Sequence, residues 1–266
     1  MTNHEFQELV WQKGRELYRD MPWRQDTRPY YVLVSELMLQ QTQVDRVIPK
    51  FNDFITAFPD EQALAGASLA DVLRMWQGLG YNRRARYLHE AAKKVVNDMS
   101  GVWPATPEGL RQLPGVGPNT AGAMMAYVYN QPIVFIETNI RSVYFHHFFV
   151  GDEDVSDGEV RDVLRQTLDY EHPREFYWAL MDYGTWLKRQ GLGRITTSKH
   201  YKKQSPLEGS VRQIRGRIIA LLSVKDLSVA EVAALVGQDD RFDAALDGLV
   251  RDGLVARRDN IVHLTK

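Results

Sequence analysis

A short turn with two glycines, Leu113-Pro-Gly-Val-Gly-Pro118, places the strongest constraint on the fold. A helical pattern ends at Leu113, and a helix rich in small residues begins near Asn119. Gly115 and Gly117 permit positive φ angles and leave their backbone amides uncovered by side chains. Because these amides stand at a helix N-terminus, where the helix dipole favours an anion, we interpret the turn as a phosphate-binding corner. The alternative is a plain αα corner in which Gly and Pro only form the turn.

The rest of the first part of the chain also has helical periodicity. Apolar residues recur at spacings of three and four in residues 5–18, 30–41, 43–57, 68–76, 84–98 and 158–169. Pro and Gly breakers separate these stretches. Residues 132–136 could form a short strand or the approach to a helix. The turn at residues 113–118 therefore joins two helices, as in a helix-hairpin-helix, whose usual ligand is a DNA phosphate.

The pattern changes towards the C-terminus. Residues 188–210 lack periodicity and predict a linker or an ordered irregular arm. Beyond them, three short helices and a hairpin with its turn at Asp259-Asn260 outline a winged helix-turn-helix. The helices are expected at residues 211–223, 228–236 and 240–252. We therefore predict a helical domain (1–187), an arm or linker (188–210) and a winged-helix-like domain (211–266).

Composition excludes several classes of protein. The chain has no cysteine, which excludes disulfides, thiolate nucleophiles and a cysteine-held iron–sulfur cluster. His146 and His147 lack a third ligand at metal spacing, so we expect no metal site. No apolar run is long enough to span a bilayer, and the polar first twenty residues do not form a secretory signal. We predict a cytoplasmic protein, nucleoid-associated if it binds DNA.

Positive charge is concentrated in two places. Residues 188–266 hold 15 Lys and Arg against 9 Asp and Glu, although the whole chain has a net charge of −1. The first sixteen of them contain no acid and carry Lys188, Arg189, Arg194, Lys199, Lys202 and Lys203. A second run, Arg83, Arg84 and Arg86, lies beside Gly-Leu-Gly-Tyr81. We interpret both as phosphate contacts, with a solvated linker and an exposed helix face as the respective alternatives.

Two carboxylates occupy unusual positions. Glu36 lies in a helical stretch among Leu33, Leu37 and other apolar residues, where desolvation raises a pKa and suits a general acid. A Glu on the one polar stripe of that helix is the alternative. Glu137 follows an apolar run and precedes Thr138-Asn139, which we expect to cap the next helix; its dipole favours the anion. One neutral and one ionised acid would suit cleavage of a glycosidic bond, although a plain N-terminal acid would also explain Glu137.

Several motifs together give the chain a resemblance to a known family. They are MPWR (21–24), VSELMLQQTQV (34–44), WQGLGYNRRARYLH (76–89), LPGVGPNTAGA (113–123), ETNIRSV (137–143) and ALMDYG (179–184). In order and content, residues 20–187 resemble the helix-hairpin-helix DNA glycosylases, and among them the MutY-type adenine DNA glycosylases. The resemblance implies an all-α, two-lobed fold, here with a small C-terminal winged-helix-like segment. It also implies a monomer that binds double-stranded DNA and extrudes one nucleotide into a pocket.

The resemblance also implies roles for particular residues. Glu36 matches the acid that protonates the adenine ring, and Glu137 stands where the family has an aspartate that stabilises the sugar cation. Asn139 matches an asparagine that supports the transition state, and Gln41 matches the residue that wedges into the base stack. Asn119 stands where relatives that also cut the strand have a lysine, so we expect base removal without β-elimination. Tyr81 and Asn82 complete the expected base pocket.

This chain departs from the family in four ways. Glu replaces Asp at position 137, and one methylene shifts a carboxylate by about 1.5 Å, which can cost on the order of 100-fold in rate. A basic arm follows ALMDYG in place of a four-cysteine cluster loop. Asn82 replaces a tyrosine, and the winged-helix-like segment stands where relatives carry a MutT-like domain. The acidic stretch 239–253 in that segment argues against docking in the major groove and favours a packing role or protein contact.

These features lead to one prediction with two alternatives. We predict a base-excision-repair enzyme that removes adenine mispaired with 8-oxoguanine or G, without a cofactor and without lyase activity. The first alternative is a glycosylase for mismatched thymine, uracil or a modified base. The second is a catalytically weak DNA-binding protein on the same fold, which the Glu at position 137 keeps open.

Overall fold

The computed structural model describes residues 1–199, 201, 206–237 and 239–265. The chain divides into two compact units that do not follow its linear order. Unit 1 comprises residues 1–32, 104–112 and 116–203, and unit 2 comprises residues 33–103, 113–115 and 204–266. Helices predominate in both, as the periodicity predicts. Among the described residues, no helix is long and apolar enough to cross a membrane.

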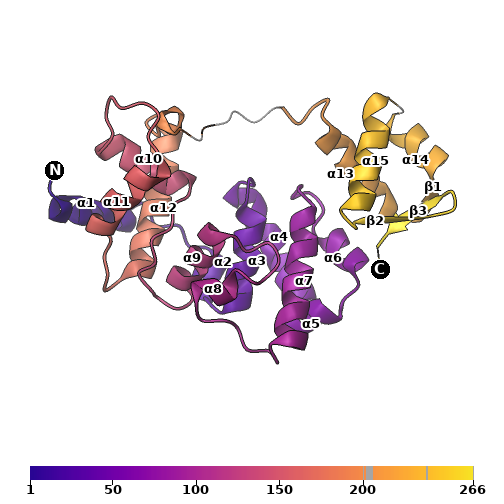
Figure 1. Ribbon diagram of the computed structural model, residues 1–266, viewed down its shortest axis with the longest axis horizontal. Helices are drawn as coiled ribbons and strands as arrows, with labels where there is room; N and C mark the ends of the chain where they lie inside the picture. Colours follow the sequence, from indigo (N-terminus) through magenta and orange to yellow (C-terminus); the bar gives the residue numbers. More distant parts are fainter. Residues whose placement is uncertain (200, 202–205, 238, 266) are drawn as a thin grey trace. The chain divides into compact units, whose positions relative to one another are not determined.

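Unit 1 is built on two long helices that lie side by side, α1 and α12 (Figure 1). Gly14 permits their close approach, because a Cβ at this position would lie 2.6 Å from the Cβ of Ala179. Phe6, Tyr144 and Phe176 are fully buried in the aromatic core of the unit. Its helices are α1 (Asn3–Leu17), α2 (Pro22–Gln25), α8 (Pro107–Leu110), α9 (Pro118–Tyr127), α10 (Thr138–His147), α11 (Asp157–Thr167), α12 (Pro173–Arg189) and the 3-10 helix η1 (Ile195–Thr197).

Local signals fix the helix ends in this unit. Thr2 and Glu5 form a capping box at the start of α1, and Ser156 and Glu159 form another at α11. Residues 132–136, which could have been a strand, are irregular and lead directly into α10.

The first half of unit 2 is a helical bundle around Phe51, Phe54 and Trp76, all of which are buried. Its helices are α3 (Pro29–Leu39), whose first turn belongs to unit 1, α4 (Val44–Ala57), α5 (Glu61–Gly66), α6 (Leu69–Met75) and α7 (Arg83–Asp98). The short α5, which the periodicity did not predict, packs against α7. Asp60 caps α5 by accepting a hydrogen bond from the amide of Ala63 at 2.8 Å.

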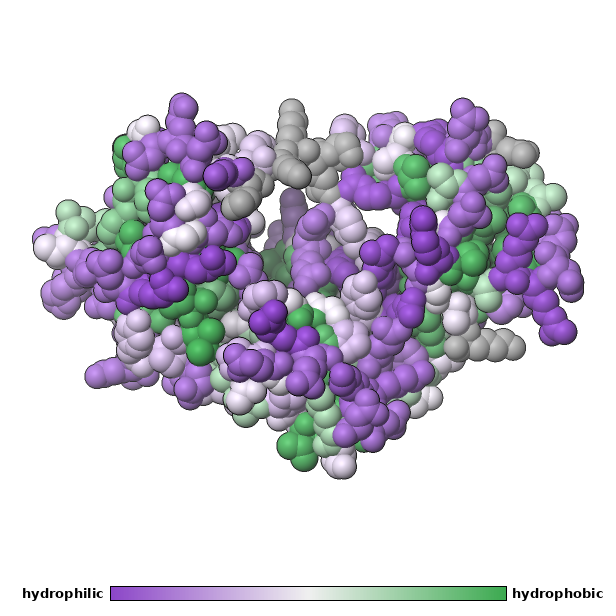
Figure 2. All heavy atoms as spheres, in the orientation of Figure 1, coloured by the Kyte–Doolittle hydropathy of each residue, from purple (hydrophilic) through white to green (hydrophobic). Residues whose placement is uncertain are grey.

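The C-terminal part of unit 2 has the predicted winged-helix outline. It contains α13 (Val211–Leu222), β1 (Leu227–Ser228), α14 (Val229–Val236), α15 (Asp240–Arg251), β2 (Val255–Arg258) and β3 (Ile261–Leu264). The predicted hairpin is confirmed, since β2 pairs antiparallel with β3 across Asp259-Asn260. The strand β1, which the sequence did not reveal, pairs antiparallel with the other edge of β3. On the face that Figure 2 shows, hydrophilic side chains cover most of the molecule and apolar ones form small patches.

Candidate active site

Glu137 stands at the entrance to α10 in unit 1. It is itself the N-cap, with an extended backbone (φ −133°, ψ 178°), whereas the sequence had assigned the cap to Thr138-Asn139. Its side chain makes no capping hydrogen bond, which leaves the carboxylate available for another partner. The residue is half-buried, and the fully buried Ile136 and Ile140 flank it.

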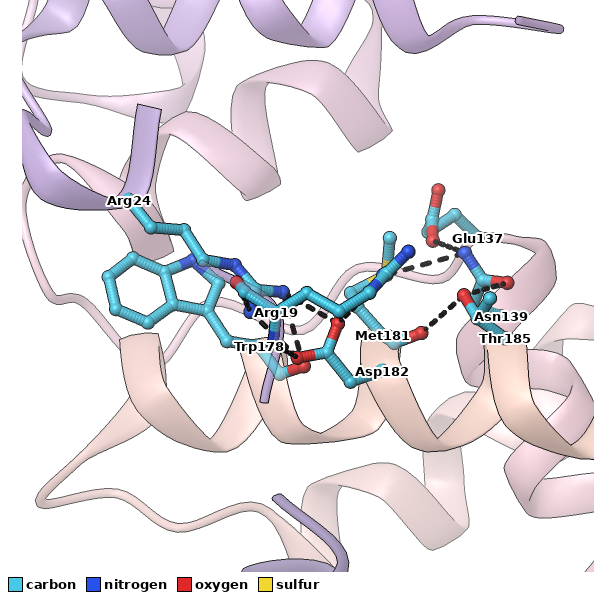
Figure 3. Close-up of polar contacts among 8 residues, drawn as sticks. All are labelled: Arg19, Arg24, Glu137, Asn139, Trp178, Met181, Asp182 and Thr185. Carbon is cyan, nitrogen blue, oxygen red and sulfur yellow. Dashed lines mark hydrogen bonds and ion pairs between the residues drawn. The ribbon is translucent and has the colours of Figure 1, made fainter. Parts of the chain in front are cut away.

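That partner is Asn139, in the first turn of the same helix (Figure 3). Its Nδ2 donates to Oε1 of Glu137 at 3.1 Å and contacts Sδ of Met181 at 3.9 Å. On the other side of the amide, the hydroxyl of Thr185 lies 3.4 Å from Oδ1 of Asn139. Met181 and Thr185 lie one turn apart on α12, so α12 forms one wall around the Asn139 amide.

Opposing effects act on the ionisation of Glu137. Burial raises the pKa of Glu137 above the ordinary value of 4.5, although the hydrogen bond from Asn139 and the charges of Lys188 and Arg141 lower it in part. Desolvation therefore opposes the ionised form that the helix dipole favours, and the ionised state of Glu137 stays a prediction.

Lys188 is the cation of α12 that acts on this carboxylate. Burial lowers the pKa of Lys188, and the charge of Glu137 raises it in part. The side chain as a whole is exposed, but its stem is packed, since a Cβ on Gly193 would lie 2.6 Å from Cγ of Lys188. Arg141 is occupied elsewhere, because its Nη2 pairs with Asp157 at 2.7 Å.

A buried ion pair fixes α12 on the opposite side of Met181 (Figure 3). Asp182 is 3% exposed and binds Arg24 with both oxygens, at 2.7 and 3.0 Å. Arg19 adds a third contact at 2.6 Å, and the guanidinium of Arg24 lies over the ring of Trp178 at 5.3 Å. A bidentate, buried pair of this kind holds α12 in one register, which fixes the positions of Met181 and Thr185.

Glu36, the second carboxylate of interest, is in unit 2. It is half-buried in α3, and its neighbours Val34, Ser35 and Leu37 are buried. The setting of its carboxylate and its role as a general acid stay predictions. Because Glu36 and Glu137 belong to different units, their action on one substrate stays a prediction.

One of the two glycines of the turn adopts the positive φ that glycine permits. Gly115 has φ +78°, and a Cβ there would lie 2.8 Å from Cβ of Tyr87. Gly117 is different, since it is the extended N-cap of α9 (φ −87°) and a Cβ there would meet no atom within 4 Å. Gly117 therefore does not use the positive φ that a glycine permits, but the space beside it, at the start of α9, is open. Asn119 is exposed in the first turn of this helix.

Two of the predicted wedge and pocket residues have a positive backbone φ. Gln41 is exposed with φ +57°, and Tyr81 is 37% exposed with φ +47°. Such angles are uncommon for residues other than glycine and cluster at functional sites. Asn82 is half-buried and precedes α7. Arg212 lies over the Tyr81 ring, with its guanidinium carbon 5.5 Å from the ring centroid, and donates to the Tyr81 hydroxyl.

Arg84 requires a correction. Its side chain is buried rather than exposed, and its guanidinium donates to the carbonyl oxygens of Leu37, Met38, Leu79 and Gly80 at 2.6, 2.9, 3.1 and 2.9 Å. Burial lowers the pKa of Arg84 to about 10, so the group stays charged at neutral pH. It closes the C-terminal end of α3 and the loop before α7, and we no longer assign it a phosphate contact.

The other two arginines of this run contact the C-terminal segment. Nη2 of Arg83 pairs with Asp252 at 2.6 Å, and Arg215 of α13 pairs with the same carboxylate. Arg86 binds Glu90 at 2.7 Å and donates to the carbonyl oxygen of Asp252. The residue that follows the acidic α15 therefore packs against α7, in line with the packing role expected for this segment.

The basic arm is ordered over its described part. Lys188 and Arg189 form the last turn of α12 rather than the start of a linker, and both are exposed. Residues 190–199 then fold back on unit 1, where Lys199 donates its amide to the carbonyl of Val155 at 3.1 Å. Lys202 and Lys203 lie outside the described residues. Among the residues that the structure describes, no group of His, Asp and Glu side chains could hold a metal ion.

Sequence reasoning missed two residues of this site. Thr185 carries no motif signal, and its role depends on a contact with a residue 46 positions away. Gly184 belongs to the quoted ALMDYG motif but had no assigned role. A glycine inside a long amphipathic helix indicates a close approach, and this was the available signal.

The sequence matches the HhH-GPD superfamily of base excision DNA repair proteins over residues 34–168. It is 35% identical to the adenine DNA glycosylase of Mycobacterium tuberculosis, over 90% of this chain and 86% of that protein. The chain belongs to this family. The adenine DNA glycosylase of Mycolicibacterium smegmatis is 31% identical over 89% of this chain and 88% of that protein.

Solved structures share the helix-hairpin-helix glycosylase fold. A thermostable thymine-DNA glycosylase superposes with a TM-score of 0.62 at 23% identity, over 68% of this chain and 85% of that one. An endonuclease III trapped covalently on DNA superposes with a TM-score of 0.56 at 17% identity, over 78% and 91% of the two chains. At these identities the likeness concerns the fold, and it confirms the predicted fold class.

Proposed function

We propose that the protein is a DNA glycosylase that removes adenine mispaired with 8-oxoguanine or G from double-stranded DNA. The observation that carries this proposal is its 35% identity to an adenine DNA glycosylase over most of both chains. The Glu137–Asn139 pair supports it, because a carboxylate in a half-buried, desolvated setting stabilises a nearby cation far better than one in water. An enzyme with this substrate acts on chromosomal DNA and belongs in the nucleoid.

The reaction is hydrolysis of the N-glycosidic bond. Glu36 donates a proton to a ring nitrogen of adenine, so the base leaves with the bonding electron pair as a neutral molecule. The ionised carboxylate of Glu137 faces the positive charge that develops on the sugar, and Asn139 holds that carboxylate. Water then adds to the sugar and loses a proton to the solvent, from which Glu36 is protonated again. An abasic site and free adenine remain. Because the pKa of Glu137 is raised, its carboxylate becomes protonated as the pH falls, and the reaction then loses the ionised form that it needs.

Contacts with DNA use the remaining site residues. Gln41, which has a positive φ, enters the base stack, and Tyr81 and Asn82 line the base pocket. The uncovered amides of the Gly115–Gly117 turn donate hydrogen bonds to one phosphate, and the exposed Lys188, Arg189 and Lys199 donate to others. The protein acts as a monomer.

The proposal includes neither a lyase activity nor an iron–sulfur cluster. Asn119 has no amine to attack the abasic sugar, so the strand is not cut by β-elimination. A chain without cysteine cannot hold a four-cysteine iron–sulfur cluster, and the ordered segment 190–199 takes the place of the cluster loop.

A panel of duplexes tests the proposal. Labelled strands carry A opposite 8-oxoguanine, G, C and T, or T and U opposite G, and alkali converts abasic sites to breaks. Breaks only at A opposite 8-oxoguanine or G, and only after alkali, are expected. Breaks at T or U would support the mismatch alternative, and tight binding without product would support the catalytically weak one. Borohydride should trap no adduct, because a trapped adduct would reveal an amine nucleophile.

The catalytic acid has a separate test. Glu36→Gln should lower the single-turnover rate of adenine release by about 100-fold or more, because the proton donor is lost. Its affinity for the A:8-oxoguanine duplex should stay within about twofold of the natural chain. Glu16→Gln, on the exposed face of α1, is the matched control and should leave both values unchanged. Full activity in Glu36→Gln would remove Glu36 from the mechanism.

A further inference from the structure

We infer that Thr185 is a positioning residue, whose hydroxyl orients the amide of Asn139 so that Asn139 holds the carboxylate of Glu137. The inference deepens the proposed function and rests on it for its catalytic consequence. Its structural part concerns the free protein and can be measured without any substrate. All three residues belong to unit 1 and appear together in Figure 3.

The contacts form a short relay from α12 to α10. The hydroxyl of Thr185 lies 2.8 Å from the carbonyl oxygen of Met181 and 3.4 Å from Oδ1 of Asn139. The single hydroxyl hydrogen of Thr185 is therefore shared between two acceptors, and its shorter hydrogen bond is the one to the carbonyl oxygen of Met181. Nδ2 of Asn139 then donates to Oε1 of Glu137 at 3.1 Å.

Chemistry fixes the orientation of this amide. An ionised carboxylate only accepts hydrogen bonds, so the NH₂ group of Asn139 must face Glu137. Its oxygen then faces α12, where the Thr185 hydroxyl can donate to it. A valine in place of Thr185 would offer no donor, and the amide could then turn away from the carboxylate.

A glycine makes the relay possible. A Cβ at Gly184 would lie 2.1 Å from the carbonyl oxygen and 2.8 Å from Cα of Asn139. The backbones of α12 and α10 therefore touch at this point, and no residue larger than glycine fits between them. Because Thr185 is the next residue on α12, this close approach brings a short hydroxyl side chain within reach of Asn139.

A purely structural explanation of Thr185 makes a different prediction. Threonine in helices often bonds to the carbonyl four residues earlier, and the bond to Met181 is of this kind. Its loss would change stability without changing the protonation of Glu137. In unit 1, the other charged groups that act on Glu137 are Lys188 of α12 and Arg141 of α10, and Arg141 is paired with Asp157. Replacing Thr185 leaves all of these charges in place.

The test measures the ionisation of Glu137 directly. The full-length protein is labelled with ¹³C at glutamate carboxyls, and the Glu137 signal is assigned by its loss in Glu137→Gln. Thr185→Val keeps the β-branched shape and removes the hydroxyl, and Thr185→Ser keeps the hydroxyl. Thr56→Val is the matched control, since Thr56 makes the same bond to its own helix, at 2.8 Å, on an exposed face of α4.

The inference requires three results. Thr185→Val should raise the pKa of Glu137 by about half a unit, because the ionised form loses part of one hydrogen bond. Thr185→Ser and Thr56→Val should leave that pKa unchanged. In an Asn139→Ala background, Thr185→Val should produce no further shift, since Thr185 acts through Asn139. Thr185→Ala replaces the valine variant if the latter does not fold.

Activity gives the catalytic consequence. The acid limb of the single-turnover rate should move by the same half unit, so Thr185→Val should be about threefold slower than the natural chain well below that limb. An unchanged pKa of Glu137 in Thr185→Val, or an equal shift in the Asn139→Ala background, would overturn the inference. If the natural chain releases no adenine, the proposed function fails, whereas the titration still decides whether Thr185 orients Asn139.

Discussion

Asn139 donates its side-chain amide to the carboxylate of Glu137, two residues earlier, at 3.1 Å. The pair sits at the N-terminus of α10, where the backbone of Glu137 forms the cap and its side chain does not. The carboxylate thus depends on one side-chain donor and on the helix dipole, and desolvation raises its pKa despite both. Because the proposed reaction needs the ionised carboxylate, we expect protonation of Glu137 to slow the reaction at low pH.

The first prediction concerns the pH dependence of the rate. Because the ionised Glu137 is required and its pKa is raised, adenine release should begin to fall at a pH above the ordinary value of 4.5. Single-turnover rates from pH 4 to 8 measure this acid limb. Glu137→Gln should be inactive throughout the range. An acid limb at or below the ordinary glutamate value would show that burial does not control this group in the complex.

The second prediction concerns stability. A group whose pKa is higher in the folded than in the unfolded protein stabilises the fold at low pH, and that contribution is lost as the pH rises through the folded pKa. Glu137→Gln cannot ionise, so its free energy of unfolding relative to the natural chain should increase between pH 4.5 and pH 7. Urea unfolding at several pH values measures this difference. A difference that does not vary with pH would contradict the raised pKa.

The third prediction compares two glycines of one turn. Gly115→Ala should lower the free energy of unfolding by about 2 kcal/mol, because it forces a side chain into positive φ and against Tyr87. Gly117→Ala should fold as well as the natural chain, because its extended backbone and the open space accommodate a methyl group.

If a phosphate uses the space over α9, the Gly117→Ala variant should nevertheless bind duplex DNA about tenfold more weakly. Thermal unfolding and fluorescence anisotropy with a labelled duplex measure the two effects. Normal DNA affinity in Gly117→Ala would place the phosphate elsewhere.

The fourth prediction follows from the burial of Arg84. Arg84→Met should lower the free energy of unfolding by roughly 3 kcal/mol or more, because several buried carbonyl oxygens lose their donor. Arg189→Met, at the exposed end of α12, is the control and should stay within about 0.5 kcal/mol of the natural chain. A stable Arg84→Met variant with weakened DNA binding would restore the phosphate role that we have withdrawn.

The fifth prediction concerns the basic arm. Arg189→Gln and Lys199→Gln should each weaken binding to matched and mismatched duplexes equally, because phosphate contacts carry no sequence information. Each should also reduce the slope of log affinity against log salt by about one. Titrations at several salt concentrations measure the slope, and an unchanged slope would mean that the side chain does not reach a phosphate.

Local sequence patterns predict where the helices lie, but they do not predict what each side chain contacts. Periodicity and capping residues depend on neighbours within one turn, so helices such as α4 and α7 could be placed to within a residue or two. Three arginines in one run looked alike in the sequence. A helix turns by about 100° per residue, however, so Arg84 is buried while Arg83 lies on the surface and pairs with Asp252.

The sequence by itself determined the class of fold, the family, the Gly115 turn and the two acids, because each of these depends on residue type at a fixed spacing. Only the tertiary structure decided that Glu137 is desolvated, that Arg84 is structural and that Thr185 reaches Asn139. The last two properties arise from contacts between segments more than forty residues apart. Such contacts depend on the close approach of whole helices, as at Gly184, and a one-dimensional pattern does not encode that distance.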